Sequence, residues 1–344
     1  MRRLRFVLPL GLAILVVAAA AYLGWTWYAA PVTRAQSPVI VDITPGAPLR
    51  QIARELHAQG VLPRAWSLWL LARLRGEAHA LRAGEYAVAP GTTVAGLLAL
   101  LKSGKVVLHS LTLVDGWTFA QILQAVESDP ELQHTLAGLD DAKIMQRLGH
   151  PGESPEGRFY PDTYQFPKGT TDVAFLDRAY RAMRGALTHA WQQRAPGLPY
   201  QTLYDALILA SIVEKETAQP KERPEIAGVF VRRLEKGMRL QSDPTVIFGL
   251  GKAYAGKITY KDLRTDTPYN TYTRNGLPPT PICIPGLPAI EAALHPAPGD
   301  ALYFVARGDG THQFSATLAE QNAAVKKYQL DGMHNNGKRQ IHQR

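Results

Sequence analysis

An uncharged stretch of 23 residues, from Phe6 to Tyr28, limits where the rest of this chain can lie relative to a membrane. At about 1.5 Å per residue, a helix of that length can cross the hydrocarbon core of a bilayer. Three arginines precede it, and two tryptophans and a tyrosine lie at its far end, as in a membrane-interface belt. We therefore expect a cytoplasmic tail over residues 1–5, a single-pass transmembrane helix over 6–28, and the remainder outside the cytoplasm.

A cleaved signal peptide is the alternative interpretation, since small residues follow at Ala29 and Ala30. The apolar core would be unusually long for such a peptide, which favours the anchor. Residues 29–38, which contain two prolines and a serine, are expected to form a linker.

The net charge of +9 first suggests a nucleic-acid partner, but the charge is concentrated at the two ends of the chain. Most of the excess positive charge lies in residues 1–5, in the basic tail 331–344 and in two lysines just before that tail. The rest of the chain is nearly neutral. Basic ends on a neutral body suggest membrane contacts or solvated tails, so we expect no nucleic-acid partner. The single cysteine, Cys283, excludes a disulfide framework and a cysteine-based zinc site.

The fold class is expected to be α+β, because short alternating stretches precede amphipathic helical ones. This strand–turn–helix pattern occurs three times, with strands expected near 39–43, 86–88 and 111–114. The repeats predict a small α+β module over residues 39–127. A turn-rich connecting segment, 128–155, then leads to a larger domain over 156–330.

That larger domain is predicted to begin with three helices and to end in a hairpin. The helices are expected over 172–192, 202–217 and 221–238, and a loop-rich region over 241–300 separates them from the hairpin. The hairpin strands are expected at 302–305 and 312–315, around a Gly-Asp-Gly turn.

The second of these helices carries the strongest catalytic candidate, Glu216. It ends an apolar stripe formed at helical spacing by Ile208, Leu209, Ile212 and Val213. Apolar surroundings disfavour the charged form of a carboxyl group and raise its pKa, which suits a general acid near neutral pH. Periodicity alone leaves open a pair of solvated glutamates at a helix end.

A second polar group of residues lies in the loops of the larger domain. Amphipathic rings beside amides and hydroxyls are what a sugar site requires. An ordered loop held by local turns is the alternative. The candidate substrate-binding residues of the whole chain are Asp243, Thr245, Tyr269, Asn270, Thr271, Tyr272 and Glu214.

Other chemistries lack their sequence signatures. No Gly-rich phosphate loop, close histidine pair or Gly-x-Ser-x-Gly motif occurs, so we expect no cofactor and no metal.

The chain resembles the MltG (YceG-like) family of endolytic murein transglycosylases over most of its length. The motifs that carry the resemblance are Tyr160-Pro161-Asp162-Thr163-Tyr164, Ala210-Ser211-Ile212-Val213-Glu214-Lys215-Glu216-Thr217, Leu240-Gln241-Ser242-Asp243-Pro244-Thr245, Tyr269-Asn270-Thr271-Tyr272, Gly276-Leu277-Pro278-Pro279 and His295-Pro296-Ala297.

The resemblance implies a LysM-like character for the small module and a periplasmic domain that cuts within peptidoglycan strands. It implies cleavage between N-acetylmuramic acid and N-acetylglucosamine, 1,6-anhydro ends, termination of strand growth, and penicillin-binding synthases as partners. The essential glutamate of the family corresponds to Glu216. One departure concerns Ile284, which stands where many relatives carry asparagine.

Two other functions remain open at this stage. A muramidase would use the same acid with water, and a non-catalytic glycan-binding or scaffold protein of wall synthesis would not need Glu216 at all.

Overall fold

The computed structural model describes residues 14–19, 22, 24–26, 28–33 and 35–330. The predicted cytoplasmic tail, much of the predicted transmembrane helix and the basic tail 331–344 lie outside the described residues. Within the described part of the chain, no helix is both long and apolar enough to span a bilayer.

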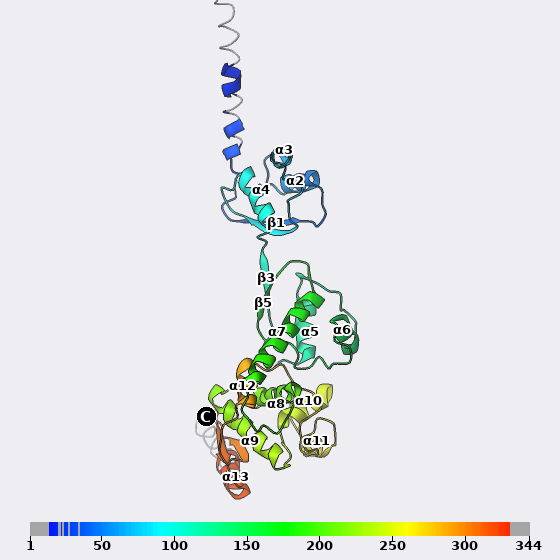
Figure 1. Ribbon diagram of the computed structural model, residues 1–344, viewed down its shortest axis with the longest axis vertical. Coiled ribbons are helices and arrows are strands. Elements are labelled where there is room, and N and C mark those ends of the chain that lie inside the picture. The colour runs from blue at the N-terminus through cyan, green and yellow to red at the C-terminus, as the bar shows by residue number, and fades with distance from the viewer. Residues whose placement is uncertain (1–13, 20–21, 23, 27, 34, 331–344) are drawn as a thin grey trace, which may run out of the picture. The chain divides into compact units, whose positions relative to one another are not determined.

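The chain divides into two compact units, and the first is discontinuous in sequence (Figure 1). Unit 1 comprises the residues up to His109 together with Gln165–Gly169, and unit 2 comprises Ser110–Tyr164 and the residues from Thr170 onward. This division differs from the predicted module over 39–127, because the third strand–turn–helix repeat belongs mainly to unit 2.

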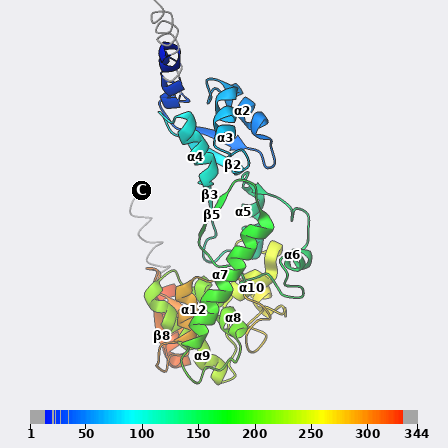
Figure 2. The ribbon, with the colours of Figure 1, turned by 45° about the horizontal axis from the view of Figure 1, so that its top comes forward.

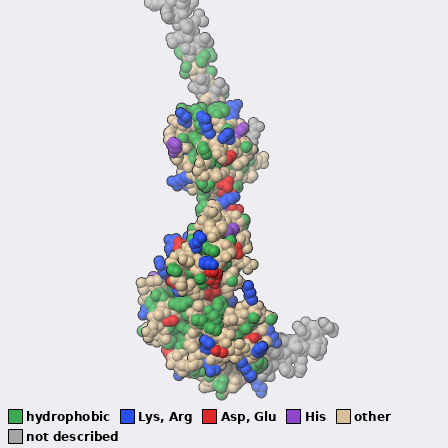
Figure 3. Space-filling model, turned by 90° about the vertical axis from the view of Figure 1, so that its right-hand side faces the viewer, with side chains coloured by type: hydrophobic (Ala, Val, Ile, Leu, Met, Phe, Trp, Pro, Cys, Tyr) green, Lys and Arg blue, Asp and Glu red, His purple; other side chains and the backbone are tan. Residues whose placement is uncertain are grey.

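Basic and acidic side chains are interspersed on the face drawn in Figure 3, in keeping with a nearly neutral body.

Unit 1 is built on an antiparallel pair of strands, β1 (Val39–Ile43) and β2 (Gly84–Val88), in which Val41 lies opposite Tyr86. The helices α2 (Leu49–Ala58), α3 (Ala65–Leu74) and α4 (Val94–Ser103) belong to the same unit. The apolar faces of all these elements form one core. The structure confirms the first two strand–turn–helix repeats and adds α3, which sequence analysis missed.

The returning segment 165–169 is held to unit 1 by side chains as well as by sequence continuity. Phe166 is fully buried, and its ring lies 6.5 Å from that of His109. The Lys168 ammonium forms ion pairs with Asp42 and Glu85, at 3.7 and 3.9 Å. The segment overlaps β5 (Thr163–Pro167), which pairs with β3 (Leu108–Thr112).

Unit 2 has a helical core in which α8 (Leu203–Glu216) is central. Eight consecutive residues of α8, from Ala206 to Val213, are buried. The helices α7 (Asp172–Gln192), α9 (Arg223–Glu235) and α12 (Leu287–Leu294) pack against it (Figure 2). The charged side chains of α8 therefore lie at its two ends.

The other elements of unit 2 are short. They are α5 (Phe119–Ser128), β4 (Leu132–Gln133), α6 (Asp141–Arg147), β6 (Thr170–Thr171), a 3₁₀ turn at Pro220–Glu222, α10 (Asp243–Leu250), a 3₁₀ turn at Gly251–Ala253, α11 (Tyr260–Arg264), β7 (Tyr303–Ala306), β8 (His312–Ser315), α13 (Leu318–Val325) and a π-helical turn at Lys326–Leu330.

The three long helices and the hairpin were predicted correctly, within a few residues at their ends. The prediction of a loop-rich region over 241–300 was wrong at α10, α11 and α12. Proline occupies the first turn of both α10 and α12, where its missing N–H group costs nothing. Proline is also common in loops, so its presence does not distinguish the two structures in a sequence.

Candidate active site

Glu216 is the last residue of α8, where the buried apolar helix reaches the edge of its core. Its side chain is only partly exposed to solvent. Burial raises the pKa of the Glu216 carboxyl to about 7, and the nearby Asp243 carboxylate adds to the effect. A group with this pKa can both donate and accept a proton near neutral pH.

Ser242 is the direct partner of this carboxyl group. Its hydroxyl donates a hydrogen bond to Oε1 of Glu216, which opposes the rise in pKa. The preceding residue, Gln241, has a left-handed backbone conformation, with φ at 55°. This is unusual for a residue other than glycine and is found where the surrounding structure enforces it.

Two buried threonines hold the backbone of Ser242 in place. The Ser242 N–H donates to Oγ1 of Thr271 at 2.9 Å, and the Thr245 hydroxyl donates to the Ser242 carbonyl at 2.7 Å. The two hydroxyl groups also contact each other at 2.9 Å. Thr245 and Thr271, both predicted to bind substrate, thus lie beside Ser242 as supports that solvent does not reach.

Arg233 is a buried cation beside this turn, and sequence analysis missed it. Its guanidinium donates to the carbonyls of Leu302, Arg239 and Leu240 at 2.6 to 3.0 Å, and to the side-chain amide of Gln241 at 3.2 Å. The positive charge also favours the ionised form of Glu216.

A sequence signal for Arg233 did exist. It continues the apolar row Ile226, Val229 and Phe230 of α9 at the next helical position. An arginine in such a row must find partners inside the protein.

Asp243 and Tyr272 form the exposed side of the site. Asp243 opens α10, and its Oδ1 accepts a hydrogen bond of 2.5 Å from the Tyr272 hydroxyl. Burial and the adjacent carboxylate raise the pKa of Tyr272 well above its usual range, so its phenol stays protonated and donates. Of the predicted substrate-binding residues, these two are the best placed to meet a ligand.

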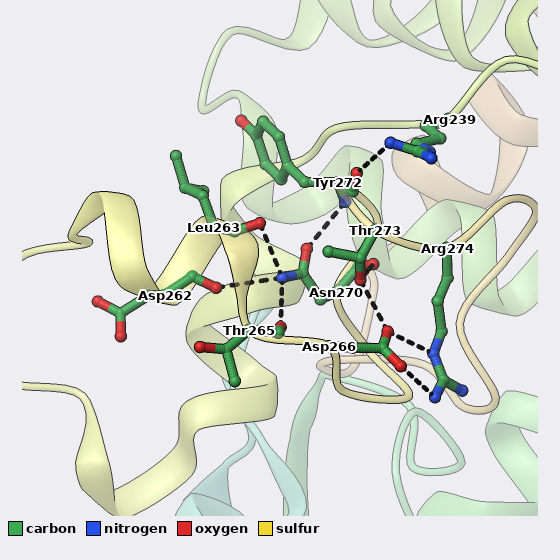
Figure 4. A network of polar contacts seen from close by, with 9 residues as sticks. All are labelled: Arg239, Asp262, Leu263, Thr265, Asp266, Asn270, Tyr272, Thr273 and Arg274. Atoms are coloured by element: carbon green, nitrogen blue, oxygen red, sulfur yellow. Dashed lines mark hydrogen bonds and ion pairs between the residues drawn. The ribbon is translucent and has the colours of Figure 1, made fainter.

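Asn270 lies at the centre of a saturated hydrogen-bond network (Figure 4). Its amide nitrogen donates to the carbonyls of Asp262, Leu263 and Thr265, and its Oδ1 accepts from the Tyr272 N–H. The residue is only 1% exposed. Its polar atoms are therefore committed to fixing the loop that carries Tyr272, and the geometry does not support direct contact with a sugar.

Tyr269 is likewise engaged within the protein. Its hydroxyl contacts Oγ1 of Thr280 at 2.9 Å, and its ring packs edge-on against Phe248, with centroids 4.9 Å apart. This aromatic pair joins α10 to the loop that contains Asn270.

Glu214, a predicted substrate-binding residue, serves a different surface from Glu216, because two residues advance about 200° around a helix. It forms an ion pair with Arg223 at 2.9 Å and accepts a hydrogen bond from the Gly286 N–H at 3.1 Å. Its carboxyl is almost completely buried by these partners. Glu214 thus joins three segments of the fold.

Ile284 is fully buried next to this junction. Its N–H donates to the Trp117 carbonyl and its own carbonyl accepts from the Gly116 N–H, both at 2.8 Å. These are backbone contacts, so they do not depend on whether isoleucine or asparagine occupies this position.

Glu156 is a second carboxyl group with a pKa raised to about 7 by burial. Both of its oxygens accept from the Phe119 N–H, at 3.1 and 3.2 Å, at the first turn of α5. Its partners make it a helix-terminus support.

The chemistry available at Glu216 is proton transfer by a single carboxyl group. Across the described residues, no group of three or more histidine, cysteine, aspartate or glutamate side chains could hold a metal ion. Glu216, Ser242, Asp243 and Tyr272 together supply an acid, its hydrogen-bond donor, a negative charge and a phenol.

The chain is similar to known proteins over most of its length. The family model described as the YceG-like family matches residues 41–327. An endolytic murein transglycosylase of Bacillus subtilis is 30% identical over 313 residues, which span 85% of each chain. One from Streptococcus pneumoniae is 29% identical over 78% of this chain and 54% of its own length. A crystal structure of a YceG-like protein from Listeria monocytogenes superposes with a TM-score of 0.52, at 31% identity, over 84% of this chain and 99% of the other.

Proposed function

Because the chain belongs to the YceG-like family, we propose that it is an endolytic murein transglycosylase in which Glu216 is both acid and base. The observation that carries the assignment is the Glu216 carboxyl at the end of α8, with its pKa raised to about 7. An environment that raises the pKa of a carboxyl group in this way is what a general acid requires at neutral pH.

The first step we propose is protonation of the leaving oxygen. Protonated Glu216 donates its proton to the glycosidic oxygen between N-acetylmuramic acid and N-acetylglucosamine. The bond from that oxygen to C1 of the muramic acid breaks, and positive charge develops on the muramic acid ring. The Asp243 carboxylate, which already raises the Glu216 pKa through its charge, would favour that positive charge.

The second step closes an internal ether. The Glu216 carboxylate takes the proton of the C6 hydroxyl on the same muramic acid, and O6 bonds to C1. Glu216 is protonated again, no water is consumed, and the new end is a 1,6-anhydro sugar. Because the hydroxyl is already attached to the reacting ring, its effective concentration is high.

Ser242 would keep the two roles of Glu216 in balance. Its hydroxyl stabilises the ionised form of the carboxyl, in opposition to burial. Without it, Glu216 would hold its proton more tightly and would be a weaker acid in the first step.

The cellular setting is part of the proposal. The helix predicted over 6–28 would anchor the protein in the inner membrane, with residues beyond 30 in the periplasm. There it would cut nascent strands and terminate their elongation beside penicillin-binding synthases. The LysM-like character of residues 39–127 stays a prediction.

Product analysis tests the reaction. Uncrosslinked glycan strands would be incubated with the protein, and the fragments read by mass spectrometry. We expect anhydro-ended fragments from the wild type and from Glu214→Gln, a matched control at the same helix end whose amide can still accept from Arg223. We expect none from Glu216→Gln.

Other outcomes would replace the proposal. Fragments heavier by one water would identify a muramidase. Intact strands with every protein, despite binding to them, would indicate a glycan-binding or scaffold role.

A further inference from the structure

A pocket of about 450 Å³ lies within unit 2 at the opposite end of α8 from Glu216. It is bounded by the first residues of α8, by α7 and by the segment 150–158. The 14 residues from Leu203 to Glu216 correspond to about 20 Å of helix. The pocket is therefore separate from the acid, and its volume is in the range of small-molecule sites.

The floor of this pocket is apolar. Met183, Leu187 and Leu207 line it, and all three are buried core residues. Such a floor favours the small apolar side chains of a short peptide.

Two aromatic rings in the pocket each have one face already covered. The Tyr180 ring stacks on His150, with centroids 3.9 Å apart, and the Arg158 guanidinium lies 4.4 Å from the centroid of Tyr204. Sugars bind through the open faces of such rings. The occupied faces argue against a saccharide as the ligand.

The charged groups of the pocket favour an anion. The negative charge of Glu153 is offset by its neighbours, because the carboxylate pairs with Arg158 at 3.4 Å and accepts a hydrogen bond from the Tyr180 hydroxyl at 2.7 Å. The Nε atom of Arg158 is buried and has no hydrogen-bond partner among the described residues. Arg184 also lines the pocket, and its side chain is exposed with no ion pair to any described residue.

We propose that this pocket binds a short peptide through its carboxylate, with Arg184 as the anion-recognising residue. The guanidinium fork is suited to a carboxylate, and the apolar floor to an alanyl side chain. The identification of this peptide as the stem attached to murein rests on the proposed function. A stem bound here would be carried by a sugar remote from the bond under cleavage, because the acid is at the far end of α8.

Direct binding tests the proposal without any cleavage. The probe is a fluorescent murein stem peptide with free carboxylates, titrated with the full-length protein in detergent. The same peptide with its carboxylates amidated, and a chitin oligosaccharide, serve as competitors. We expect amidation of the peptide to weaken binding about tenfold, and the oligosaccharide not to compete.

Variants on one helix provide the matched comparison. Arg184→Gln should weaken binding about tenfold, with partial rescue in Arg184→Lys. Arg181→Gln should leave binding unchanged, because Arg181 is exposed on the same helix, pairs with Asp177 and does not line the pocket. An unchanged melting temperature for Arg184→Gln would exclude unfolding as the cause.

Three results would overturn the proposal: equal binding of the amidated peptide, unchanged binding in Arg184→Gln, or displacement by the oligosaccharide. Failure of the proposed reaction would look different. Glu216→Gln should abolish cleavage and leave peptide affinity intact, so each idea can fail without the other.

Discussion

Replacing Glu216 by glutamine is expected to make the protein more stable at pH 8 while abolishing cleavage. Burial raises the pKa of this carboxyl from 4.5 to about 7, so the folded state binds the proton more tightly than the unfolded state. Wild-type stability therefore falls as the pH rises from about 4.5 to about 7, and stays lowered above that range.

The magnitude follows from the same values. One pKa unit corresponds to about 1.4 kcal/mol, so the full effect is about 3 kcal/mol, and about 2 kcal/mol if solvent screens part of the charge. A glutamine of the same shape avoids this cost, and its Oε1 can still accept the hydrogen bond from Ser242.

The assay is urea unfolding of wild type and Glu216→Gln at pH 4 and pH 8. The two proteins should have similar free energies of unfolding at pH 4, and the variant should exceed the wild type by about 2–3 kcal/mol at pH 8. Glu156, whose pKa is also raised, is present in both proteins and cancels in the difference. Equal stability at pH 8, or a less stable variant, would refute the claim that the fold raises the pKa of Glu216.

Further predictions concern the groups around Glu216. With this carboxyl as the acid, kcat/KM on glycan strands should fall about tenfold per pH unit above about 7, and a flat pH profile would contradict the assignment. In Ser242→Ala the loss of the donated hydrogen bond should raise the Glu216 pKa further, and the alkaline limb of the profile should move to higher pH. Asn270→Ala should cost about 2–4 kcal/mol in urea unfolding, because three carbonyls lose their donor, and Asn270→Asp should not restore the loss. Arg233→Lys should cost about 2–4 kcal/mol in the same assay, since an ammonium cannot satisfy acceptors arranged around a guanidinium fork; a change below about 0.5 kcal/mol would rule this out.

The sequence predicted the raised pKa of Glu216 because its physical cause is local. A single helix carries both the apolar stripe and Glu216, so helical periodicity was sufficient to find the carboxyl that burial would affect. The family resemblance, now supported by a match over residues 41–327, pointed to the same residue.

The partners of that acid come from distant segments, which periodicity cannot bring together. Ser242 meets Glu216 across 26 positions, and Arg233 binds Leu302 across 69. The sequence also could not separate residues that face the solvent from those that brace the loop. Asn270 and Asp243 looked equivalent as polar loop residues, and only the fold shows that one is enclosed by carbonyls and the other is exposed.

The interleaving of the two units restricts how such a protein can be cut or recombined. A truncation that begins at residue 110 removes most of unit 1 but leaves behind Gln165–Gly169, with Phe166 deprived of its buried site. Because one unit is inserted into the other's sequence, the N-terminal module cannot be exchanged by a single crossover between genes. An exchange of unit 1 would have to replace both of its segments together.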